Sequence, residues 1–242
     1  MGLQNAKLSW SLPQGVAFRT STPSLQLSSP ASNIDISMSL PRSRWPLLLS
    51  GPDIGPAMLY WGVLIVILLV AVALGRVIKQ FHLHIPVNTW QWVLLAIGMS
   101  TVNMAGSIFV VLWFFALEAR ARLGLPEKRW KFNLMQLALA ALTLIAAASL
   151  FSTIPDSLLS TPDMQVSGNG SSNYVYNWYQ DNSPELLPRG HVWSVPMGVY
   201  RVAMLAWSLW LVFALLRWTK WSWQCFSRDK LWAAKEKKAE EK

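Results

Sequence analysis

The sequence predicts an all-α membrane helix bundle with a short β-rich segment at its N-terminus. Four apolar stretches without an acidic residue, at residues 57–75, 90–117, 132–154 and 195–216, each reach the ~20 residues that a helix needs to cross a bilayer. Only 14% of the 242 residues are charged, against about 25% in soluble domains. The residues before the first stretch alternate apolar and polar side chains, which is the period of a strand.

The N-terminal segment, residues 1–45, shows this alternation twice, at residues 8–12 and 34–40, with prolines between as turn signals. So few short strands hardly bury a core of their own. The pattern therefore indicates either the end of a larger β-sandwich or a set of strands that pairs with a partner chain. An extended leader without regular structure is the alternative interpretation.

Residues 46–56 are predicted to form a hinge, because two Gly-Pro pairs between residues 51 and 56 exclude a helix. The short leucine run before them predicts a segment that dips into the membrane interface. The transmembrane bundle then covers residues 57–217, with an outside loop at 155–194. The basic tail, residues 218–242, is expected to be cytoplasmic.

The second apolar stretch has small and polar residues in its middle, where a membrane helix is normally most apolar. They are Gly98, Ser100, Thr101, Asn103 and Gly106. Such residues favour a helix break, a kink or a close helix contact, and polar groups at membrane depth are also candidates for a transport pathway. We interpret these five positions as packing or pathway residues. A break near Asn103 would make the stretch a re-entrant hairpin rather than a span.

Basic residues between the spans restrict the topology to two arrangements. Four crossings with both termini inside place seventeen Lys and Arg inside and three outside. Three crossings with the N-terminus outside and a re-entrant second stretch place fifteen inside and five outside. Both arrangements predict a cytoplasmic C-terminus and a periplasmic loop 155–194. The side of the N-terminus stays open.

The fourth stretch and its continuation carry four tryptophans on about one quarter of the helix circumference, with Ala214 between two aromatic pairs. They are Trp207, Trp210, Trp218 and Trp221. This stripe is predicted to be a docking face for neighbouring helices or a partner subunit, because a deep indole N–H needs a protein acceptor. Interface anchoring alone would explain the two tryptophans nearer the cytoplasmic end.

The sequence contains no pattern that indicates a catalytic, cofactor-binding or metal-binding site. The three histidines, His82, His84 and His191, lack the spacing of a zinc site, so we expect no metal, no cofactor and no catalytic residue. The net charge of +9 does not predict nucleic-acid binding, because the cations gather at the ends of the apolar stretches. The expected partners are the lipid bilayer and other membrane or periplasmic subunits.

Several phrases resemble the C-terminal membrane portion of large bacterial inner-membrane proteins of uncharacterised function that carry β-rich regions outside the membrane. They are Asn33-Ile34-Asp35-Ile36-Ser37, Leu40-Pro41-Arg42-Ser43-Arg44-Trp45, Gly51-Pro52 with Gly55-Pro56-Ala57, Thr89-Trp90-Gln91-Trp92, and Val195-Pro196 with Val199-Tyr200-Arg201. The resemblance implies that residues 1–45 end a periplasmic β domain. It therefore supports three crossings, whereas the charge count favours four.

The sequence therefore predicts a non-enzymatic multi-pass protein of the bacterial inner membrane, an anchor or assembly subunit of an envelope complex. The alternative is a transporter or channel component built around a broken helix at Gly98–Gly106. Stable co-purification with a partner would distinguish the first hypothesis, and a water-accessible path past Asn103 would distinguish the second.

Overall fold

A computed structural model describes residues 7–9, 11, 15–100, 104–122, 129–228 and 231. Within these ranges the chain forms two compact units. The β-rich unit combines the described parts of Met1–Ala57 with Gly168–Val195, and the helical unit combines those of Met58–Ser167 and Pro196–Lys242. The predicted boundary at residue 45 and the assignment of loop 155–194 to the bundle differ from this division. The physical reason is strand pairing between segments on either side of four helices.

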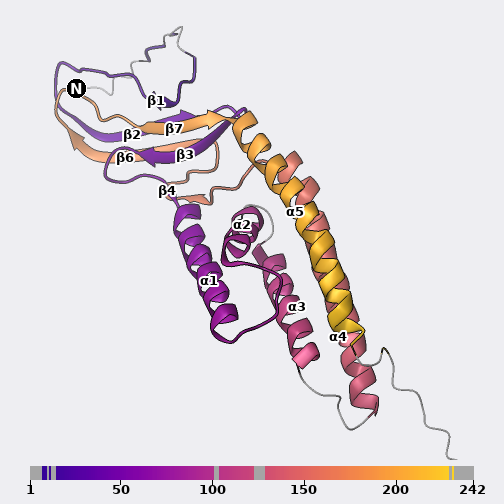
Figure 1. The fold of residues 1–242 in the computed structure, drawn as a ribbon. Coiled ribbons are helices and arrows are strands. Elements are labelled where there is room, and N and C mark those ends of the chain that lie inside the picture. The colour runs from indigo at the N-terminus through magenta and orange to yellow at the C-terminus, as the bar shows by residue number, and fades with distance from the viewer. Residues whose placement is uncertain are drawn as a thin grey trace, which may run out of the picture. The chain divides into compact units, whose positions relative to one another are not determined.

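Within its described residues, the β-rich unit contains five strands (Figure 1). Their bounds are β1 (Arg19–Ser21), β2 (Ala31–Ser39), β3 (Arg44–Ser50), β6 (Val175–Ser183) and β7 (His191–Pro196). One sheet has the order β1-β7-β3, and a second consists of β2 and β6, which run antiparallel. Each sheet therefore joins N-terminal strands to a strand from the connection between the last two helices.

Strand β2 shows the alternation that the sequence predicted at residues 34–40, with half-buried apolar residues separated by exposed polar ones. Its register places Ile36 opposite Trp178 and Met38 opposite Tyr176. The strand predicted at residues 8–12 is not found in the part of that segment that the structure describes, since residues 8, 9 and 11 lie outside any strand. The β-rich N-terminal part is thus confirmed, with a different set of strands.

Trp178 lies at the centre of the β-rich unit, where its side chain is 2% exposed. Its ring centroid is 6.2 Å from that of Tyr176. A Cβ atom at Gly51, Gly55 or Gly190 would lie 2.5, 2.3 or 2.7 Å from an atom of the indole. Glycine at these positions therefore leaves the space that the indole fills.

The residues predicted as a hinge, 46–56, belong largely to this unit. Pro46 lies in β3, an edge strand of its sheet, where a missing backbone N–H is tolerated. Ile54 exchanges both backbone hydrogen bonds with Tyr179, at N···O distances of 3.3 and 2.7 Å. The two Gly-Pro pairs exclude a helix, as predicted, and the segment between them is held against β6.

The helical unit contains three helices that are long and apolar enough to cross a membrane: α1 (Tyr60–Gln80), α4 (Arg129–Leu159) and α5 (Met197–Phe226). The second predicted apolar stretch, residues 90–117, contains two helices, α2 (Thr89–Ser100) and α3 (Met104–Arg122) (Figure 1). Among the described residues the apolar segments of membrane length thus number three rather than four.

Helix α4 continues through Pro155 to Leu159, so the predicted outside loop begins with helical turns. Two strands of two residues, β4 (Ala57–Met58) and β5 (Val166–Ser167), pair with each other. The Leu59 N–H also donates to the Gln165 carbonyl at 3.3 Å. The first turn of α1 and the chain that follows α4 are therefore joined within the helical unit.

Helices α2 and α3 run in opposite directions. The loop before α2 meets the end of α3, because the His84 N–H donates to Glu118 Oε1 at 2.8 Å and the Arg122 guanidinium donates to the His82 carbonyl. Farther along the pair, Trp92 of α2 contacts Phe114 of α3 edge-to-face, with centroids 5.4 Å apart. The second apolar stretch is thus a helical hairpin whose two ends lie together.

Candidate functional site: the helix seam and the Glu118 cavity

Gly98 lies where α2 contacts α5. A Cβ atom at this position would lie 1.9 Å from Cε2 of Trp207, so any side chain would overlap the indole. The Trp207 N–H donates to the backbone carbonyl of Leu94 at 2.8 Å. A glycine one turn beyond that carbonyl lets the ring approach the backbone closely. The deep indole thus has the protein acceptor that it needs.

Of the other four candidate packing or pathway residues, the structure describes Ser100 and Gly106. The Ser100 hydroxyl donates to the Ile97 carbonyl at 2.8 Å and lies 3.3 Å from the Tyr60 hydroxyl, which joins α2 to the start of α1. Gly106 is buried in the first turn of α3. Thr101 and Asn103 lie outside the described residues.

Of the four tryptophans predicted as a docking face on α5, Trp207, Trp218 and Trp221 contact the hairpin of the same chain, and Trp210 contacts Trp218. Trp207 and Trp218 are buried, at 7% and 0% exposure. Phe114 of α3 receives Trp218 edge-to-face at 5.1 Å and Trp221 in a tilted contact at 5.9 Å, and Trp210 lies edge-to-face to Trp218 at 6.2 Å. The face predicted to dock a partner is therefore largely covered by α2 and α3, and we call it the helix seam.

Sequence reasoning missed a buried carboxylate at the end of α3. The side chain of Glu118 is 4% exposed, and its Oε1 accepts from the His84 N–H at 2.8 Å and from Arg122 Nε at 2.7 Å. Burial raises the pKa of Glu118, but these two donors stabilise the ionised form more strongly, so its pKa lies below the ordinary value. The carboxylate is therefore charged at neutral pH.

Polar side chains on α3 and α4 bind the backbone at the end of α5. Arg120 Nη2 donates to the Arg228 carbonyl at 2.8 Å, and Gln136 Nε2 donates to the Phe226 carbonyl at 3.2 Å. In return, Arg228 Nη1 donates to the Ala121 carbonyl at 2.8 Å. Because the last carbonyls of a helix lack partners within the helix, these donors stabilise the end of α5 against α3 and α4.

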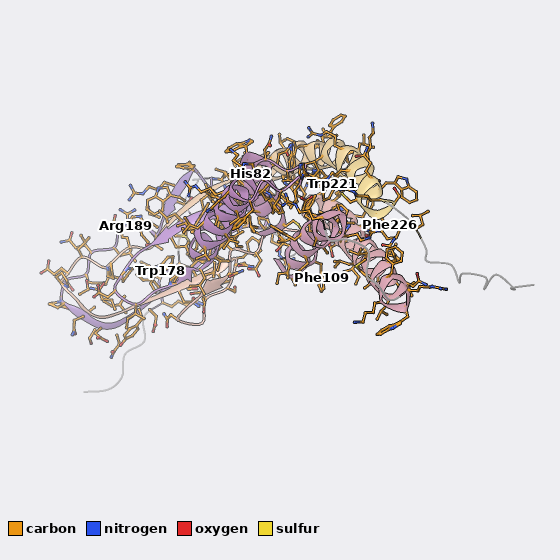
Figure 2. All side chains as sticks on the ribbon, turned by 60° about the horizontal axis from the view of Figure 1, so that its bottom comes forward. His82, Phe109, Trp178, Arg189, Trp221 and Phe226 are labelled. Atoms are coloured by element: carbon orange, nitrogen blue, oxygen red, sulfur yellow. The ribbon has the colours of Figure 1, made fainter. Side chains whose placement is uncertain are left out.

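A cavity of about 320 Å³ opens between the ends of α3 and α5, and we call it the Glu118 cavity. Its lining includes His84, Glu118, Arg122, Trp221 and Arg228. Figure 2 shows the Trp221 and Phe226 side chains on α5 near this end of the helix. Acidic, basic and aromatic groups thus border one hollow in the helical unit.

One sequence signal could have located this site. Glu118 follows the second apolar stretch directly and lies four residues before Arg122, a spacing that pairs side chains on one helix face. The carboxylate lies just past the stretch, so a search for acidic residues inside spans passes over it. The contact with His84 is 34 residues away in the chain and leaves no local pattern.

The histidines do not meet at one place. His84 lies at the Glu118 cavity, whereas His191 lies in β7 of the β-rich unit, which also contains Trp178 and Arg189 (Figure 2). The described part of the chain contains no group of three His, Cys, Asp or Glu residues placed to hold a metal ion. Burial and the nearby cations Arg19 and Arg189 lower the pKa of His191.

A second hollow, of about 390 Å³, lies between α1, α2 and α3. Its walls are apolar along most of their length, with side chains such as Val70, Leu95 and Ile108. The hydroxyl-bearing residues Ser100 and Ser107 also line it. The lining therefore offers few polar groups to an ion.

Comparisons with protein-family models, curated proteins and solved structures find no match to this chain.

Proposed function

We propose that this protein is a non-enzymatic integral membrane subunit that anchors a β-rich unit at the outer face of the bacterial inner membrane and assembles with other envelope proteins. In this proposal α1, α4 and α5 cross the membrane. The α2–α3 hairpin enters from the cytoplasmic side and returns to it. The N-terminus lies outside and the basic tail inside.

The observation that carries the proposal is the pairing of β2 with β6. Strand β2 precedes α1, and β6 lies between α4 and α5, yet their residues pair from Ala31 opposite Ser183 to Ser39 opposite Val175. Paired strands lie on one side of a membrane. A four-crossing arrangement would separate these segments, whereas three crossings bring them together.

The α2–α3 hairpin also supports three membrane crossings. Re-entrant backbone is tolerated in a membrane only where protein buries it. Trp207 donates to the α2 backbone, and Phe114 of α3 is 0% exposed beneath the tryptophans of α5. The hairpin is therefore enclosed by protein along the helix seam. Fifteen Lys and Arg residues then lie inside and five outside, which agrees with the usual cytoplasmic excess.

A second apolar stretch that contains two helices, α2 and α3, is also the feature that a transporter or channel component would need. However, the space beside Gly98 is filled by the Trp207 indole, and the neighbouring hollow is mainly apolar. Tight packing at this point favours an anchoring bundle over a hydrated pathway, so we place the transporter second.

Single-cysteine labelling in intact spheroplasts tests the sidedness, with Cys225→Ser as the background. Ser29→Cys and Ser172→Cys, both at exposed positions of the β-rich unit, should react with an impermeant maleimide. Lys220→Cys should react only after permeabilisation. If Ser29→Cys were protected while Ser172→Cys reacted, the N-terminus would be inside and the proposed anchor would be wrong.

Assembly is tested separately by co-purification in mild detergent followed by mass spectrometry. The proposal predicts a stoichiometric envelope partner that stays bound to the full chain and is lost when Gly55→Leu disrupts the packing around Trp178. Recovery of the chain alone under conditions that preserve the membrane complexes would contradict the assembly role and leave the topology result intact.

A further inference from the structure

In the Glu118 cavity, Glu118 is paired with Arg122 but not with Arg228, the other arginine of the lining. Within the described residues, the polar contacts of Glu118 all involve Oε1, so its Oε2 has no protein donor. Arg228 lines the same cavity and uses Nη1 for the Ala121 carbonyl, and it forms no ion pair with Glu118. One carboxylate oxygen and part of one guanidinium are therefore left for a third group.

A ligand that pairs with both Glu118 Oε2 and Arg228 carries a cationic group with N–H donors and, a short distance away, an anionic group. Arg122 does not supply the anion site, because its guanidinium is already committed to Glu118 and to the carbonyls of Phe81 and His82. A primary ammonium suits the acceptor Oε2, and a phosphate suits Arg228, since guanidinium groups bind phosphate oxygens with two parallel donors.

We propose that the Glu118 cavity binds the zwitterionic headgroup of an aminophospholipid, with its ammonium at Glu118 and its phosphate at Arg228. This inference rests on the proposed membrane topology, which puts the end of α5 at the cytoplasmic interface. Trp221 lines the cavity, and tryptophan is enriched at the level of lipid headgroups. The apolar surface of α5 before this residue then lies beside the acyl chains.

The two charges also predict which lipids are rejected. A choline headgroup has no N–H and leaves Oε2 of the largely buried Glu118 side chain without a protein or ligand donor, which is unfavourable for a carboxylate in a partly desolvated site. A glycerol headgroup brings the phosphate without a cation. The cavity should therefore prefer phosphatidylethanolamine to phosphatidylcholine and to phosphatidylglycerol.

Native mass spectrometry of the full chain tests this preference after release from nanodiscs containing the three phospholipids in equal amounts. Wild-type protein should retain phosphatidylethanolamine over phosphatidylcholine by at least about tenfold, the ratio equivalent to ~1.4 kcal/mol. Glu118→Gln keeps an acceptor for His84 and Arg122 but presents an amide to the ligand, so it should abolish the preference. Arg228→Gln should reduce retention of every phospholipid.

Lys220→Gln is the matched control, because it removes an exposed cation of α5 that does not line the cavity, and it should behave as wild type. Equal retention of ethanolamine and choline lipids by wild-type protein, or an unchanged preference in Glu118→Gln, would overturn the inference. Displacement of the lipid by soluble phosphoethanolamine at comparable concentration would assign the cavity to a free ligand and overturn the lipid assignment. Correct sidedness in the cysteine assay without lipid preference would refute this inference alone.

Discussion

Gly98 gives the sharpest prediction at the residue scale. Gly98→Ala places a methyl group 1.9 Å from the Trp207 ring, so we expect a loss of about 1–3 kcal/mol in stability from overpacking. Thermal denaturation in detergent, followed by tryptophan fluorescence, measures the change. Gly62→Ala is the matched control, since nothing lies within 4 Å of its added Cβ atom. Equal melting curves for the two variants would mean that α2 and α5 do not pack at this point.

A comparison of Trp207 with Trp218, on the same helix, measures how much an indole hydrogen bond contributes to stability. The Trp207 N–H donates to Leu94, whereas the buried Trp218 N–H has no acceptor among the described residues. Substitution by Phe removes a similar volume from each. Trp207→Phe should therefore cost about 1 kcal/mol more than Trp218→Phe, the net worth of a hydrogen bond. A larger loss for Trp218→Phe would contradict the assignment of donors in the helix seam.

His191 predicts a pH dependence for the β-rich unit. Burial and the cations Arg19 and Arg189 lower its pKa in the folded state below the ordinary 6.5. The unfolded chain then binds the proton more readily, so stability falls as pH decreases through 6.5 and levels off below the folded-state pKa. His191→Gln should flatten this part of the stability profile measured by urea denaturation. An unchanged slope between pH 7 and 5 would exclude His191 as its source, since ordinary histidines titrate near ~6.5.

At the scale of elements, local pattern predicts what local contacts determine. The alternation of apolar and polar side chains predicted the strand at residues 34–40. The length of the apolar stretches predicted α1, α4 and α5. The strand β3 was missed because Pro46 and its leucines are also typical of an interfacial segment, and only pairing with β7 decides between the two. The small residues near Gly98 predicted a break or a contact. Gly98 contacts Trp207, and α2 ends at Ser100 and α3 begins at Met104.

The hairpin should open at its ends when Arg122 is removed. Arg122 joins Glu118 to the carbonyls of Phe81 and His82, so Arg122→Gln should release the loop before α2. Hydrogen exchange at the His84 amide should accelerate by roughly ten- to a hundredfold, which corresponds to losing a charge-assisted hydrogen bond. Arg129→Gln, at the start of α4, is the control. Unchanged protection of His84 would show that the loop is held by its other contacts.

At the scale of the whole molecule, long-range pairing is what the sequence could not reveal. Counting cations favours four crossings, because the count treats the segments outside the spans as independent. The register between β2 and β6 links segments more than 130 residues apart, and no local signal records it. The Glu118 cavity has the same origin, since its walls come from the loop before α2, from α3 and from α5.

A disulfide trap between β2 and β6 tests the central claim, that the segments before α1 and after α4 form one unit on one side of the membrane. In a Cys225→Ser background, the matched pairs Ser32→Cys with Asn182→Cys and Ser39→Cys with Val175→Cys lie directly opposite each other. Mild oxidation of intact spheroplasts should cross-link at least one matched pair. The mismatched pair Ser32→Cys with Val175→Cys should stay reduced. Absence of a cross-link in both matched pairs, with the chain folded and membrane-inserted, would contradict the account.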